Sequence, residues 1–141
     1  MKLWLDDLRP APEGYRWCKS VNEAKQTIDK LEYLVSMYDE NASYLPYAYF
    51  GDAEDAPESL RFRCMADCAR LIRLRDMHAI ELIDIDHDAG DYACDGGDYI
   101  KLLDWLEETG RDYPIRIHSQ NAVGVQNMRA IIQRNGWREI R

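Results

Sequence analysis

The chain has 141 residues, with 26 acidic and 18 basic side chains, a formal net charge of −8 and 46% hydrophobic residues. This length and composition predict one domain with a buried core and exclude wholesale disorder. The acidic balance argues against a surface that coats duplex DNA. No apolar run approaches the roughly 18 residues of a membrane span, and residues 1–7 turn acidic too early for a signal peptide. Because the four cysteines include no Cys-x-x-Cys pair, we predict reduced thiols and a cytoplasmic protein without membrane contact.

Short apolar runs alternate with helical stripes along the chain. Ser20 and Glu23 have the spacing of a capping box, which marks the start of one helix. The alternation predicts an α/β fold, with a mostly parallel sheet of about five strands and helices on both faces. The expected strands are 2–5, 15–19, 80–86, 115–119 and 137–140, and the expected helices are about 21–36, 57–77, 99–106 and 125–132.

Residues 37–77 interrupt the compact pattern. Residues 37–56 hold four tyrosines among polar residues, proline and glycine, without a convincing period, so we expect either a functional long loop or a poorly ordered insertion. The helix expected from Pro57 carries arginines that favour a solvated face, or alternatively a guide for anionic ligands. The insertion at about 37–77 is also a candidate surface for homo-oligomerisation. Its arginines are Arg61, Arg63, Arg70, Arg73 and Arg75.

Polar side chains follow three of the predicted strands. Asp6 and Asp7 come after the first strand, an Asp-His-Asp run at 86–88 comes after the central strand, and His118 and Ser119 end a later strand. In a parallel α/β sheet the functional site lies beyond the carboxyl ends of the strands. We therefore expect these three motifs to converge.

Three motifs in this order resemble the cyclic-phosphate processing receiver domains, which are divergent relatives of response-regulator receivers. The motifs are KLWLDDLRPAPEG at 2–14, DHDAGD at 86–91 and IRIHSQNAVG at 115–124. The resemblance spans 1–36 and 78–141. It implies a single flavodoxin-like, receiver-like domain over residues 1–141, with the insertion described above, and a role in processing nucleotides that carry cyclic phosphates.

The resemblance also implies roles for individual residues. Ordinary receivers place an acidic pair after strand one, a phosphoacceptor aspartate after strand three, a hydroxyl residue after strand four and a lysine after strand five. Here Asp6 and Asp7 match the pair, Asp86 matches the acceptor and Ser119 matches the hydroxyl. The lysine has no counterpart in the final segment, and this argues against phosphorelay signalling.

Converging carboxylates repel one another and need a compensating charge. Oxygen ligands from Asp6, Asp7 and Asp86 suit Mg²⁺ or Mn²⁺ as a cofactor. The structural alternative is that Asp6 or Asp7 caps the turn that follows the strand.

The two histidines in strand-end motifs are candidate proton carriers. Imidazole titrates near neutral pH, so His118 or His87 can serve as general acid or base, and we favour His118 as the acid. His87 has two alternatives, a metal ligand or a side chain on the opposite face of the strand. Asn121 is a candidate phosphate contact but also a candidate helix cap. Together with Ser119 and Asp88 it forms the predicted substrate-binding set.

These residues predict a metal-assisted phosphoesterase that processes a cyclic-phosphate nucleotide or RNA end, with His118, His87 and Asp86 as its catalytic residues. The alternatives are a non-catalytic, receiver-like sensor of nucleotide and metal, and a signalling receiver that is phosphorylated on Asp86.

Overall fold

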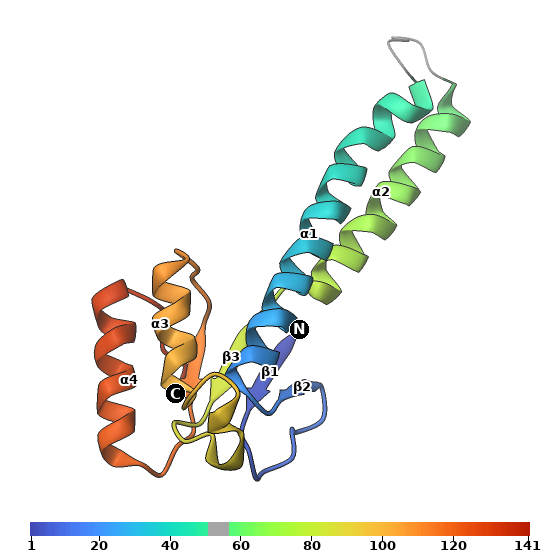
Figure 1. The fold of residues 1–141 in the computed structure, drawn as a ribbon. Helices are drawn as coiled ribbons and strands as arrows, with labels where there is room; N and C mark the ends of the chain where they lie inside the picture. The colour runs from blue at the N-terminus through green and yellow to red at the C-terminus, as the bar shows by residue number, and fades with distance from the viewer. Residues whose placement is uncertain (51–56) are drawn as a thin grey trace. The chain divides into compact units, whose positions relative to one another are not determined.

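The computed structural model describes residues 1–50 and 57–141, which form two compact units. The first unit consists of Met1–Asp29 and Ile80–Arg141, and the second is Lys30–Ala79. Figure 1 shows the helices and strands of both units. None of the described helices is both long and apolar enough to cross a membrane.

The first unit is built on a parallel sheet, which confirms the α/β fold class. The strand order is β2-β1-β3-β4, and all three pairings are parallel. Leu3 lies opposite Ile83, which lies opposite Ile115, so three apolar residues cross the sheet in one row. The strands are β1 (Lys2–Leu5), β2 (Tyr15–Cys18), β3 (Leu82–Ile85) and β4 (Ile115–Ile117).

The expected fifth strand at 137–140 is wrong, and the described residues form a sheet of four strands. Only an isolated bridge between Ile115 and Glu139 forms there. The helix that precedes it explains why. Gly136 adopts a left-handed conformation with φ of 68°, and the Trp137 N–H donates to the Ile132 carbonyl at 3.0 Å. The Trp137 N–H therefore completes the helix end, and little backbone is left to pair with β4.

The alternation of the strands gives the sheet two different faces. Leu3, Leu5, Ile83 and Ile85 are fully buried and belong to the apolar core. That core also contains buried side chains of α1 (Val21–Phe50), α3 (Ile100–Glu108) and α4 (Ala122–Asn135). The intervening positions on β1, β3 and β4 are Trp4, Asp84 and Arg116, which lie opposite one another in the register and bring polar groups to the other face.

The capping box at the start of α1 forms as expected. The Ser20 hydroxyl accepts a hydrogen bond from the Glu23 N–H at 3.1 Å, and the Glu23 carboxylate accepts one from the Lys19 N–H at 2.8 Å. Both bonds satisfy amides outside the helical hydrogen-bond pattern.

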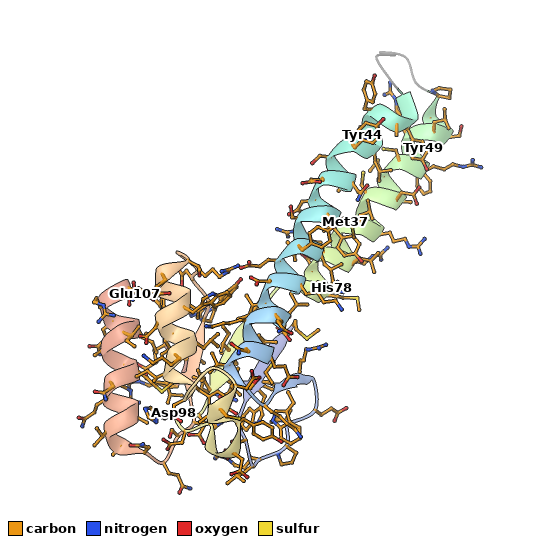
Figure 2. All side chains as sticks on the ribbon, viewed as in Figure 1. Met37, Tyr44, Tyr49, His78, Asp98 and Glu107 are labelled. Carbon is orange, nitrogen blue, oxygen red and sulfur yellow. The ribbon has the colours of Figure 1, made fainter. Side chains whose placement is uncertain are left out.

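The expectation of a loop over 37–56 is wrong as far as residue 50, because α1 continues to Phe50. The remaining part, 51–56, lies outside the described residues. Tertiary contacts with α2 (Glu58–His78) explain the extension. Asp39 forms an ion pair with Arg75 at 2.8 Å, and the Tyr49 hydroxyl donates to Asp67 at 2.5 Å. Figure 2 labels Tyr49 on α1.

The helical hairpin of the second unit exposes much apolar surface. Among the described residues, seven of the nine exposed large hydrophobic side chains belong to it. A groove of about 420 Å³ is lined by Pro46 of α1 together with α2 residues that include Cys64, Met65 and Ile72. Homo-oligomerisation through this segment stays a prediction. The seven side chains are Tyr33, Tyr44, Tyr47, Phe62, Met65, Ile72 and Met77.

Pro46 interrupts the hydrogen bonding of α1. A proline cannot donate to the carbonyl four residues earlier, which here belongs to Ala42. That carbonyl accepts instead from the Cys68 thiol on α2, at 3.8 Å. We expect Pro46→Ala to restore the backbone donor and to raise the free energy of unfolding of the hairpin by about 1 to 3 kcal/mol. Thermal unfolding followed by circular dichroism at 222 nm measures this change.

A double-mutant cycle provides the control for this prediction. Cys68→Ala should cost less stability in the Pro46→Ala background than in the wild type, because the Ala42 carbonyl then has a backbone donor. An unchanged or lower melting temperature for Pro46→Ala would contradict the explanation.

Candidate functional site

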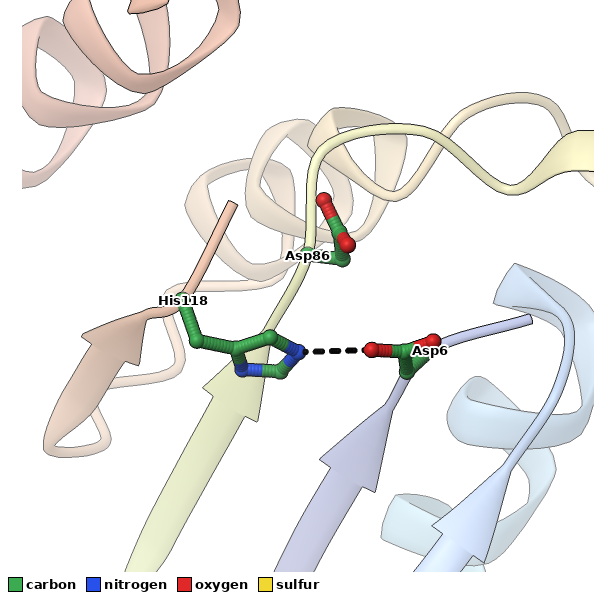
Figure 3. A group of neighbouring side chains, drawn as sticks. All are labelled: Asp6, Asp86 and His118. Carbon is green, nitrogen blue, oxygen red and sulfur yellow. Dashed lines mark hydrogen bonds and ion pairs between the residues drawn. The ribbon is translucent and has the colours of Figure 1, made fainter. Parts of the chain in front are cut away.

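Three side chains meet beyond the carboxyl ends of β1, β3 and β4. Asp6, Asp86 and His118 each follow one of these strands closely, and Figure 3 shows the His118 ring and the Asp6 carboxylate facing each other with Asp86 beside them. One ligand atom from each lies within 4.8 Å of the others. The parallel register explains this convergence, because residues that follow neighbouring parallel strands emerge at the same edge.

Asp6 is the most enclosed member of this group, with a side chain that is 1% exposed. Its Oδ1 accepts hydrogen bonds from the Leu8 and Arg9 backbone amides at 2.9 and 2.6 Å. Burial alone raises the pKa of Asp6, but the amides of Arg9 and Leu8 and the Arg9 guanidinium outweigh burial and hold the pKa below its ordinary value. Asp6 is therefore a carboxylate at neutral pH, and it also caps the turn that follows β1.

Arg9 supplies positive charge to the acidic edge. Its Nε donates to Asp6 Oδ2 and its Nη2 to Asp86 Oδ2, both at 2.6 Å. The Trp4 indole donates to the Arg9 carbonyl at 2.9 Å and fixes the loop that carries this side chain. Sequence reasoning did not select Arg9. The available signal was its position three residues after Asp6 in an otherwise acidic motif.

Asp84 is a second buried carboxylate, and it holds His118 in place. It is fully buried on β3, and its Oδ1 lies 2.6 Å from His118 Nδ1. Arg116 on β4 also donates to it. Burial raises the pKa of Asp84, but the hydrogen bonds from His118 and Arg116 outweigh burial and lower the pKa below 3.8. An acidic residue inside a buried apolar strand needs a partner, and this was the overlooked signal.

His118 is fixed on both of its ring nitrogens and on one ring face. While Nδ1 faces Asp84, Nε2 lies 3.2 Å from Asp6 Oδ2. The Trp4 ring stacks on the imidazole, with centroids 4.0 Å apart and an interplanar angle of 5°. The imidazole therefore presents a fixed Nε2 edge to the acidic centre.

His87 belongs to a separate cluster. Its Nδ1 lies 2.7 Å from Asp88 Oδ1, and the Asn121 amide donates to Asp88 at 3.2 Å. The Asn121 side chain also caps α4 by accepting from the Gly124 N–H at 2.9 Å. Its Oδ1 therefore serves the helix cap, while its Nδ2 is engaged by Asp88. A Cβ built on Gly124 would lie 2.3 Å from the His87 ring, so the imidazole packs directly on the first turn of α4.

A pocket of about 300 Å³ connects most of the predicted site residues. Asp7 lies in its wall, with its carboxylate against Gly90, where an added Cβ would come within 2.0 Å of Asp7 Oδ2. Ser119 is half-buried, and its hydroxyl accepts from the Asn121 N–H at 3.1 Å, which leaves its own proton free to donate. The lining residues are Asp6, Asp7, Leu8, Arg9, Asp86, Asp88, Ser119, Gln120 and Asn121.

A parallel α/β sheet with acidic side chains beyond its carboxyl edge is the arrangement of a receiver-like domain. The family of cyclic-phosphate processing receiver domains matches residues 1–40 and 48–134, and the chain belongs to this family. The family name points to cyclic-phosphate processing through a receiver domain. No curated protein and no solved structure matches the chain.

The first prediction for the site concerns Asp84→Asn. The substitution leaves Arg116 and His118 without their buried counter-charge, so we expect a loss of about 2 to 3 kcal/mol in the free energy of unfolding at pH 7. A lowered carboxyl pKa stabilises the fold above the ordinary value of 3.8, and this stabilisation is lost as pH falls through the native pKa. Urea unfolding from pH 7 to pH 3 should therefore show a smaller decline for Asp84→Asn than for the wild type. Parallel profiles would contradict the buried pairing.

A second prediction concerns Gly124→Ala. Alanine favours a helix by about 1 kcal/mol relative to glycine, so an unobstructed site would gain stability. We expect a net loss of about 1 to 2 kcal/mol instead, because the added Cβ overlaps the His87 ring. Thermal unfolding measures the sign, and His87→Ala in the same background should recover stability. A stabilised Gly124→Ala protein would contradict the close packing.

Proposed function

We propose that the chain is a metal-assisted phosphoesterase that opens a cyclic phosphate on a nucleotide or an RNA end. The observation that carries this proposal is a pocket lined by acidic ligands and by polar groups at the start of α4, with a ring nitrogen of His118 within 4.8 Å of carboxylate oxygens of Asp6 and Asp86. Membership of the cyclic-phosphate processing receiver family supports the substrate class.

The donor set fits a hard divalent cation. Asp6 and Asp86 offer carboxylate oxygens close together, and Asp7 lies in the same pocket wall. Oxygen donors of this kind suit Mg²⁺ or Mn²⁺. When bound, such an ion would supply charge to the phosphoryl oxygens.

His118 is suited to give a proton to the departing ribose oxygen. Carboxylates lie beside both of its ring nitrogens, Asp84 at Nδ1 and Asp6 at Nε2. The Nε2 edge reaches the acidic centre, whereas Nδ1 is held by Asp84. Asp84 acts here as a positioning residue, because it fixes the ring without contacting the substrate.

The polar segment after β4 is placed to bind the phosphate. Ser119 has a free hydroxyl proton, and Asn121 Nδ2 lies at the pocket wall beside Asp88. We assign Ser119 and Asn121 to the phosphoryl oxygens. Asp88 serves mainly to orient the Asn121 amide and the His87 ring, which keeps His87 apart from the acidic centre.

One observation favours a second function, a sensor that binds the nucleotide without turning it over. Arg9 already bridges the carboxylates of Asp6 and Asp86, so these side chains are held together before any ligand arrives. A preformed site of this kind is sufficient for binding.

Activity on a panel of 2′,3′-cyclic and 3′,5′-cyclic nucleotides, with Mg²⁺ or Mn²⁺ present, tests the proposal. We expect turnover by the wild type and a loss of about 100-fold or more in kcat/KM for Asp86→Asn and for His118→Ala. The matched controls are Asp104→Asn and His78→Ala, which change the same residue types on α3 and α2 and should retain activity.

Three outcomes separate the alternatives. Calorimetric binding of a cyclic nucleotide without product would favour the sensor. Covalent labelling of Asp86 by acetyl phosphate would favour a signalling receiver. Near-normal rates for both site variants, in a protein that does turn over the substrate, would contradict the assigned roles.

A further inference from the structure

The Arg9 guanidinium lies on the oxygen atoms that a cation would use. It contacts Asp6 Oδ2 and Asp86 Oδ2 at 2.6 Å each, and these carboxylates belong to the group that offers ligand atoms within 4.8 Å of one another. Arg9 is the one basic residue among those that line the pocket. It thus forms the positive bridge between two strand ends.

A divalent ion and this guanidinium exclude each other at the carboxylate pair. Mg²⁺ needs oxygen ligands at about 2.0 to 2.1 Å, and a guanidinium on the same two oxygens would repel it across a few ångströms. Displacing Arg9 requires only its side chain to move. The side chain is 46% exposed, whereas the backbone is anchored by the Trp4 indole at its carbonyl and by Asp6 at its N–H.

We propose that Arg9 is the resident counter-cation of the acidic pair, and that a divalent ion displaces its guanidinium, which then binds the phosphoryl group of the substrate. This inference rests on the cation site of the proposed function. The planar guanidinium forms bidentate hydrogen bonds with phosphate, and Ser119 and Asn121 lie in the wall of the same pocket. The released Arg9 guanidinium can therefore bind a phosphoryl group in the same pocket.

The exchange couples the two ligands. Without the cation, the guanidinium is engaged by Asp6 and Asp86 and unavailable to an anion. With the cation bound, Arg9 is released at the pocket, so the cation raises phosphate affinity and phosphate raises cation affinity by the same factor. The strength of this coupling depends on the side chain of residue 9.

Calorimetry with Mn²⁺ alone tests the displacement. We expect Arg9→Gln, which removes the competitor, to bind Mn²⁺ about ten times more tightly than the wild type. Arg129→Gln is the matched control, because it removes one positive charge from an exposed ion pair with Glu139 and should leave Mn²⁺ affinity unchanged. Circular dichroism verifies that both variants are folded.

Inorganic phosphate and a 2′,3′-cyclic nucleotide provide the second arm. Mn²⁺ should raise the affinity of the wild type and of Arg129→Gln for these anions by about tenfold or more, and this increase should be clearly smaller in Arg9→Gln, where only the ion itself attracts the anion, although the ion binds there more tightly. Equal or weaker Mn²⁺ binding by Arg9→Gln, or an undiminished anion response, would overturn the role of Arg9 alone. Absence of Mn²⁺ binding in all three proteins would overturn the proposed cation site as well.

Discussion

The carboxyl edge of the sheet depends on two carboxylates that are almost completely buried. Asp6 is 1% exposed and Asp84 is fully buried. A buried carboxylate is tolerated only when donors and positive charges replace its water. Backbone amides and Arg9 do this for Asp6, while Arg116 and His118 do it for Asp84. His118 contacts both acids, so one imidazole links the two ion-pair networks and inherits a fixed orientation from them.

The parallel arrangement of the strands explains which parts of the site the sequence could predict. Asp6, Asp86 and His118 follow parallel strands, and the rule that such strands end at one edge was sufficient to bring them together. Arg9 and Asp84 were missed because their roles depend on where their side chains point, which the order of the elements along the chain does not reveal. Arg9 turns back from a loop toward β1, and Asp84 faces the polar side of β3 in a strand whose other three residues are apolar.

The length of α1 likewise could be predicted only in part from the sequence. The helix from residue 21 was predicted from its cap and its apolar stripe, but its extension to Phe50 was not. Beyond residue 36 the stabilising contacts come from α2, which is distant in sequence, and Pro46 weakens the local signal further. The thiol of Cys68 accounts for the carbonyl that the proline leaves unpaired, and no periodicity in α1 alone contains that information.

One explanation covers both the absence of a receiver lysine in the final segment and the absence of a regular strand in the described residues 137–140. In ordinary receivers a lysine after strand five supplies the positive charge at the acidic edge, but here the corresponding segment forms a single bridge at Glu139. A segment so weakly paired is a poor support for a catalytic side chain. Arg9 instead sits on the loop after β1, held by the indole of Trp4, while the Trp17 indole binds the Asp6 carbonyl at 2.6 Å. The positive charge here comes from the loop after β1, where the planar guanidinium of Arg9 bridges two carboxylates at once.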